Sequence, residues 1–190
     1  MLTPEEFGAV LAELEEPYET IVLVAGCLSL RACEIIGLQW GDFDWDHVTV
    51  FIGRSATGKH IYETKTEKSS KPVPLDPSLA EVILNHRASL PFKGATDFVF
   101  AGESGSPQWR RVWFTDHIQP AAARAGIGKI GWHTFRHTFS TLIHSMGTDA
   151  VRKELLRHAD IKTTMNIYTQ PVAPAKRKAT GKLTRKLLRS

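Results

Sequence analysis

The chain has 190 residues, 23% charged residues and a formal net charge of +4, which is typical of one ordinary globular domain. Its longest apolar run, residues 21–30, is too short to span a bilayer and too far from the start to be a signal peptide. Cys27 and Cys33 form neither a disulfide framework nor a CxxC metal pair, which favours a reducing compartment.

The charge is distributed unevenly along the chain. The formal net charge is −9 for residues 1–46, +6 for residues 47–170 and +7 for residues 171–190. A polyanionic partner is therefore expected to meet the middle of the chain and its tail. A solvated helix or a disordered end explains the basic tail equally well, so charge alone leaves contact with nucleic acid open.

Two helical regions are predicted at the start. Residues 3–15 form the first, with Thr3 as a good N-cap followed by proline at the first helical position. Residues 18–38 form the second, an apolar region with Gly26 and Gly37 as interruptions. Most of this region is expected to be buried.

Arg31 is the anomaly of the second region, because a permanent charge follows a long apolar run. A buried arginine needs a partner, and Glu34 lies at the helical spacing that can provide one. The alternative is an ordinary salt bridge at the rim of the core.

A small antiparallel sheet is predicted next. Its three strands are expected at residues 48–52, 60–66 and 71–75. Lys65 lies near the end of the middle strand, and Lys68 and Lys71 follow it in the hairpin. Each lysine taken alone is explained by protection of an edge strand against aggregation.

The rest of the chain predicts helices, so the fold class is mainly α with a small three-stranded antiparallel sheet (α+β). The predicted helices cover residues 79–90, 108–126 with a kink or break at Pro120, 133–147, 149–160, 163–170 and, as a basic amphipathic helix, 174–190.

The stretch from Trp132 to Tyr168 carries the chemistry. His133 and Arg136 share one helix face, and His158 precedes Tyr168 by ten residues. Arginine binds phosphate oxygens bidentately, histidine moves protons near neutral pH, and tyrosine can act as a covalent nucleophile. This set suits phosphoryl chemistry without a metal, but a phosphodiester requires more cations from elsewhere in the chain.

Simpler explanations exist for each of these residues. His133 and His137 have a spacing seen in zinc sites, but Thr134 stands where zinc proteases have glutamate, and no third ligand has metal spacing. No metal site is therefore predicted. Tyr168 alone is more often a half-buried aromatic residue, and His158 alone more often caps a helix end.

Four motifs in order remove this ambiguity: GCLSLRACEIIGLQWGDFDWD, TKTEKSSKPVPL, HTFRHTF and LLRHADIKTTMNIY. With them the chain resembles the catalytic domain of the tyrosine recombinase (phage integrase) family over residues 3–171. The resemblance implies a catalytic domain at 1–171 and a basic C-terminal tail at 172–190. It also implies that the DNA-clamping domain that normally precedes the catalytic domain is absent here.

The resemblance assigns roles to particular residues. The implied catalytic set is Arg31, Lys65, His133, Arg136, His158 and Tyr168, with Tyr168 as nucleophile and Glu34 as the supporting partner of Arg31. Lys68, Lys71 and Arg157 are expected to contact DNA, although Arg157 stands where the family usually has glycine. The implied function is site-specific DNA recombination, by strand cleavage and rejoining through a 3′-phosphotyrosyl intermediate, with no cofactor.

The implied partners are double-stranded DNA and other protomers, in a tetramer on DNA, within the bacterial cytoplasm and as part of a mobile element. No membrane partner is expected. By family precedent, Leu183, Leu187 and Leu188 of the tail are candidates for contact with a neighbouring subunit. Two alternatives stay open: a non-catalytic DNA-binding remnant and a type IB topoisomerase-like enzyme, against which the small size and the motif around Arg31 speak.

Overall fold

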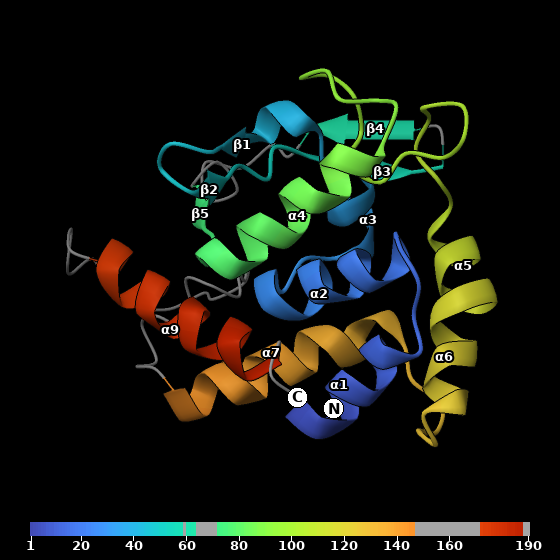
Figure 1. Ribbon diagram of the computed structural model, residues 1–190, viewed down its shortest axis with the longest axis vertical. Helices are drawn as coiled ribbons and strands as arrows, with labels where there is room; N and C mark the ends of the chain where they lie inside the picture. Colours follow the sequence, from blue (N-terminus) through green and yellow to red (C-terminus); the bar gives the residue numbers. More distant parts are fainter. Residues whose placement is uncertain (59, 64–71, 147–171, 188–190) are drawn as a thin grey trace.

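A computed structural model describes residues 1–58, 60–63, 72–146 and 172–187 (Figure 1). The helices are α1 (Pro4–Ala12), α2 (Tyr18–Leu28), α3 (Ala32–Ile36), the single 3₁₀ turn η1 (Trp40–Asp42), α4 (Pro77–Ser89), α5 (Arg110–Val112), the π-helix η3 (Trp113–Ile118), α6 (Gln119–Arg124), α7 (Trp132–Met146) and α9 (Val172–Leu187). The strands are β1 (Phe43–Asp44), β2 (Thr49–Val50), β3 (Arg54–Thr57), β4 (His60–Glu63) and β5 (Val73–Pro74).

Helix α2 lies at the centre of the helical body (Figure 1), in contact with α1, α3, α4, α7 and α9. Residues 20–28 are all buried, which explains why this helix has no polar face. Gly26 lets α1 and α2 approach closely, because a Cβ there would lie 2.5 Å from Cζ of Phe7. The apolar run therefore forms the core on which the other helices pack.

The predicted helical region 18–38 is two helices, and the break falls at Ser29 rather than at Gly26. Ser29 adopts the left-handed conformation, with φ 54° and ψ 31°, and ends α2. The physical reason lies in Arg31, because continuing the buried helix would bury the charge of its guanidinium at a large cost in free energy. The break leaves the Arg31 side chain 47% exposed at the start of α3.

The described strands form two antiparallel sheets instead of the single predicted one. Strands β1, β2 and β5 form a three-stranded sheet, and β3 and β4 form a separate hairpin. Residues 60–63 of the predicted strand therefore do not lie between the other two strands. They pair with residues 54–57, which are too polar and too few to be recognised as a strand. Gly58, with φ 58°, begins the turn of this hairpin beneath the ring of Trp109.

The predicted kink at Pro120 is replaced by a change of helix type. Helix α5 continues into the π-helix η3, which continues into α6 with Pro120 at its second position. Proline lacks the N–H that an α-helix would use here, and the wider π turn accommodates that loss. This helical run is attached to α2 by stacking of His117 on Tyr18, with ring centroids 3.6 Å apart.

Helix α9 confirms the predicted helix in the basic tail. It packs on α1, α2, α4 and α7, and beside β5. Leu183 and Leu187 are 0% and 1% exposed, so they lie in the core that the described chain forms. Their contact with a neighbouring subunit stays a prediction. Leu188 lies outside the described residues, as do the predicted helices at 149–160 and 163–170.

Within the described residues, no helix combines the length and the apolar character that crossing a membrane would require.

Candidate active site

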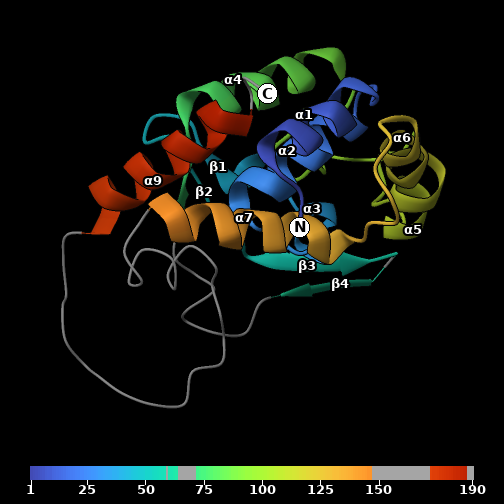
Figure 2. The same ribbon diagram turned by 90° about the horizontal axis from the view of Figure 1, so that it is seen from below.

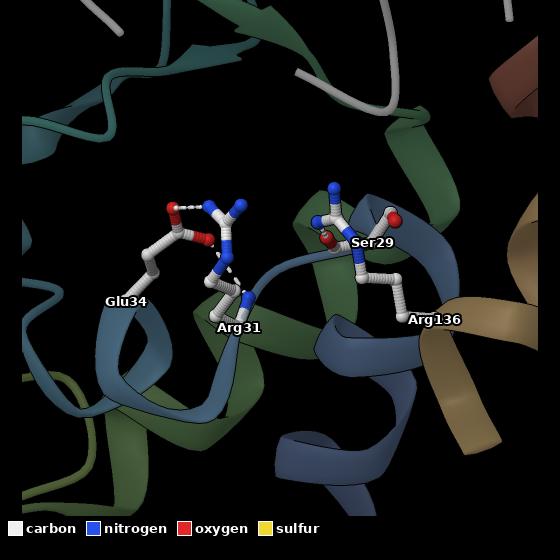
Figure 3. Close-up of polar contacts among 4 residues, drawn as sticks. All are labelled: Ser29, Arg31, Glu34 and Arg136. Carbon is white, nitrogen blue, oxygen red and sulfur yellow. Dashed lines mark hydrogen bonds and ion pairs between the residues drawn. The ribbon is translucent and has the colours of Figure 1, made fainter. Parts of the chain in front are cut away.

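The turn between α2 and α3 brings Arg31 and Arg136 together. Nη1 of Arg136, on α7, donates a hydrogen bond of 2.5 Å to the backbone carbonyl of Ser29. Arg31 follows two residues later as the N-cap of α3. Figure 3 shows both guanidinium groups pointing to the same side of this turn. Two arginines separated by about a hundred residues of sequence thus meet at one place.

Glu34 holds Arg31 in two ways. Its Oε2 accepts the Arg31 backbone N–H at 2.7 Å, and its Oε1 accepts Nη1 of Arg31 at 3.2 Å (Figure 3). The Glu34 side chain is 8% exposed, whereas that of Arg31 is 47% exposed. A buried carboxylate therefore orients a guanidinium that reaches solvent, which confirms the predicted pairing at this spacing.

We expect Glu34→Gln to destabilise the chain by about 1–3 kcal/mol, because the amide can accept from only one of the two donors and leaves the other unsatisfied. The ion pair itself adds little, since Arg31 is half exposed. Urea unfolding followed by circular dichroism measures the change.

Glu6→Gln is the matched control for that substitution. Glu6 occupies the same third position of α1, where its Oε2 accepts the Thr3 backbone N–H at 2.7 Å, but it is exposed and pairs with no arginine that the structure describes. We expect a change within about 0.5 kcal/mol there. Equal losses of unfolding free energy for the two variants would show that Glu34 acts as an ordinary helix cap and not as the buried support of Arg31.

The start of α7 fixes the direction of Arg136. The Gly131 N–H donates to Oγ1 of Thr134 at 2.9 Å, and Trp132 packs against Trp113, Phe114 and Phe135. Phe135 is fully buried, so the next residue, Arg136, is turned towards the α2–α3 connection. His133 is exposed one turn earlier on the same helix face, as the sequence predicts.

An ion pair that the sequence analysis missed supports the neighbouring hairpin. Nη1 of Arg54, on β3, donates to both carboxylate oxygens of Asp42 at 2.9 and 2.7 Å, and Asp42 also accepts the Gln39 N–H at 2.7 Å. Burial raises the pKa of the Asp42 carboxyl, while these donors oppose the rise. Because β3 packs on α3, this pair braces the element that begins with Arg31.

Comparison with known proteins identifies the family. Residues 1–173 match the Phage integrase family. The chain belongs to this family.

Relatives of this phage integrase family member include the ICEBs1 integrase of Bacillus subtilis, 26% identical over 180 residues, which cover 87% of this chain and 49% of the relative. Tyrosine recombinase XerC of Xylella fastidiosa is 35% identical over 142 residues, which cover 74% of this chain and 44% of the relative. The chain thus spans about half the length of the curated relatives it matches.

Solved structures share the fold. An integrase of the Tn1549 transposon, in complex with a circular intermediate DNA, superposes with a TM-score of 0.71 at 17% identity, over 84% of this chain and 58% of the other. The integrase from mycobacterium phage Brujita superposes with a TM-score of 0.68 at 22% identity, over 97% of this chain and 62% of the other. The fold is that of tyrosine recombinase catalytic domains, mainly α with a small antiparallel sheet.

In this family member, the structure describes part of the predicted site. Arg31, Glu34 and Arg136 meet at the Ser29 turn, and His133 lies on the helix that carries Arg136. The remaining predicted residues lie outside the described ranges: Lys65, Lys68, Lys71, Arg157, His158 and Tyr168. The sequence analysis did not predict the contact of Ser29 with Arg136. A polar residue inside an apolar run, directly before Leu30 and Arg31, could have indicated the end of the helix there.

The two cysteines are poor nucleophiles. Burial raises the pKa of the Cys27 thiol to about 12, and burial beside Glu34 raises the pKa of the half-buried Cys33 thiol. Both thiols therefore stay protonated near neutral pH, although Cys33 lies within the site.

Proposed function

We propose that this chain is the catalytic domain of a site-specific recombinase that cleaves and rejoins DNA through a 3′-phosphotyrosyl intermediate. The observation that carries the proposal is the meeting of Arg31 and Arg136 at the Ser29 turn, in a member of the phage integrase family with its fold. Two guanidinium groups on one side of a turn can bind the two non-bridging oxygens of one phosphate.

The proposed chemistry is the one that the family resemblance implies. Oη of Tyr168 attacks the phosphorus, and the bond from phosphorus to the 5′ oxygen breaks. His133 takes the phenol proton, and Lys65 gives a proton to the departing 5′ oxygen. Arg31 and Arg136 stabilise the charge of the pentavalent state. Rejoining is the reverse reaction, so it requires neither ATP nor a metal.

The remaining assignments belong to the same proposal. His158 hydrogen-bonds a phosphate oxygen, and Lys68, Lys71 and Arg157 contact the DNA backbone. Residues 1–171 form the catalytic domain and residues 172–190 the C-terminal tail. The Tn1549 integrase was solved in complex with DNA. By analogy, we propose that this chain also binds DNA, and that it acts together with other protomers in the bacterial cytoplasm. Binding through phosphate contacts should weaken steeply with salt.

A nicked suicide duplex tests this function. A pool of such duplexes with a randomised stretch around the nick is incubated with the chain at low salt, so that cleavage releases a short fragment and traps the adduct. We expect a protein–DNA adduct that survives detergent, carries DNA on the peptide containing Tyr168, and is not formed by Tyr168→Phe.

The outcomes separate the alternatives. A duplex bound without adduct formation, even with the clamp domain of a relative supplied, would overturn the enzyme and favour a DNA-binding remnant. Relaxation of supercoiled DNA with no preferred sequence among the trapped duplexes would instead favour topoisomerase-like activity.

A further inference from the structure

Ser29 combines two unfavourable features at one buried position. Its φ of 54° lies in the left-handed region, which few residues other than glycine adopt. The residue is 2% exposed, and its hydroxyl has no hydrogen-bond partner in the part of the chain that the structure describes. Such features persist only where the surrounding structure imposes them, and they cluster at functional sites.

The left-handed conformation has a specific result. It directs the Ser29 carbonyl at Nη1 of Arg136, 2.5 Å away, at the point where α2 ends (Figure 3). It also ends α2, after which Leu30 is buried and Arg31 caps α3, with its backbone N–H donating to the Glu34 carboxylate. A helical or extended residue 29 would aim the carbonyl elsewhere. One backbone conformation thus serves both arginines.

We infer that Ser29 is a positioning residue for DNA cleavage, and that its left-handed backbone, rather than its hydroxyl, orients Arg136. The inference rests on the proposed function. Ser29 does not contact the phosphate in this account; it acts through the guanidinium that its carbonyl holds. The identity of the residue therefore matters only through the backbone conformation that it permits.

Three substitutions separate backbone from hydroxyl. Ser29→Gly permits the left-handed conformation without steric cost, and Ser29→Ala removes only the hydroxyl. Ser29→Thr keeps the hydroxyl but adds a branch at Cβ, which opposes the left-handed conformation. Single-turnover rate constants for adduct formation on a trapped nicked duplex are measured for each. Unfolded molecules lower only the amplitude of this reaction, so the rate constant describes the folded molecules alone.

We expect glycine and alanine to keep the wild-type rate within about twofold, and threonine to slow it by about 10–100-fold, because small misplacements of a catalytic group have effects of this size. The same threonine substitution in an Arg136→Ala background should slow the reaction by less than about twofold, since the residue through which it acts is gone. A general packing defect would slow both backgrounds equally.

Unfolding in urea without DNA gives a second measurement. It is made on wild type, Ser29→Thr, Arg136→Ala and the double variant that carries both substitutions. The contact between Ser29 and Arg136 predicts that the two substitutions shift the unfolding midpoint non-additively. Additive shifts, a threonine variant as fast as wild type, or a glycine variant as slow as threonine would each overturn the inference. Absence of any wild-type adduct would instead overturn the proposed function, while the urea measurement would still decide whether Ser29 positions Arg136.

Discussion

Replacing Arg136 with alanine is expected to slow covalent attachment to a nicked duplex by about 10²–10³-fold, the usual effect of removing one donor that stabilises developing charge. The Ser29 carbonyl holds this guanidinium at the α2–α3 turn. Arg136→Lys should recover only part of the rate, because lysine keeps the charge but lacks the fork that matches two phosphate oxygens. Single-turnover gel assays measure both variants.

Arg124→Ala is the matched control for that loss. Arg124 lies at the end of α6, where its Nε donates to Oε2 of Glu13 at 2.8 Å, and its side chain is 55% exposed. Removing it takes away the same formal charge at a distance from the α2–α3 turn, so we expect an unchanged rate constant. An Arg124 variant as slow as the Arg136 variant would mean that overall charge, rather than the candidate site, governs the reaction.

Replacing Phe135 with alanine is expected to lower the free energy of unfolding by about 3–5 kcal/mol, the range for deleting a fully buried phenylalanine. Phe135 is 0% exposed and contacts the ring of Phe7 edge-on, with centroids 6.2 Å apart. A whole domain is stable by only about 5–15 kcal/mol, so this loss is large. Chemical unfolding followed by circular dichroism measures it.

His137→Ala, two residues further along α7, is the control for the core substitution. His137 is exposed, so we expect a change within about 0.5 kcal/mol. A loss below about 1 kcal/mol for Phe135→Ala would contradict the burial on which the direction of Arg136 depends.

Local signals in the sequence predicted the helices well. Thr3 caps α1 as expected, with its Oγ1 accepting the Glu6 N–H at 3.1 Å. This prediction succeeds because a cap and its first turn lie within a few residues of each other.

Non-local features were predicted less well. The pairing of β4 with β3 instead of β5 depends on which strands meet in space, and the polar residues 54–57 carry no strand signal of their own. The break at Ser29 keeps the charge of Arg31 out of the buried core, although serine itself does not favour the left-handed conformation. In the site, spacing alone predicted that Arg31 pairs with Glu34 and that His133 shares a helix face with Arg136. The roles of Lys65, His158 and Tyr168 came from the resemblance.

Helix α9 has a consequence for synthesis of the chain. The ribosome makes this helix after all the elements that it covers, namely α1, α2, α4, α7 and β5. Leu183 and Leu187 belong to the same buried core as Leu2 and Phe7, so the contacts of this core join residues far apart in the sequence. Such contacts form slowly, and domains fold as units during translation. The surfaces of α1, α2 and α7 that α9 covers therefore remain exposed until α9 has left the ribosome, and the described domain completes its folding only after synthesis has passed Leu187.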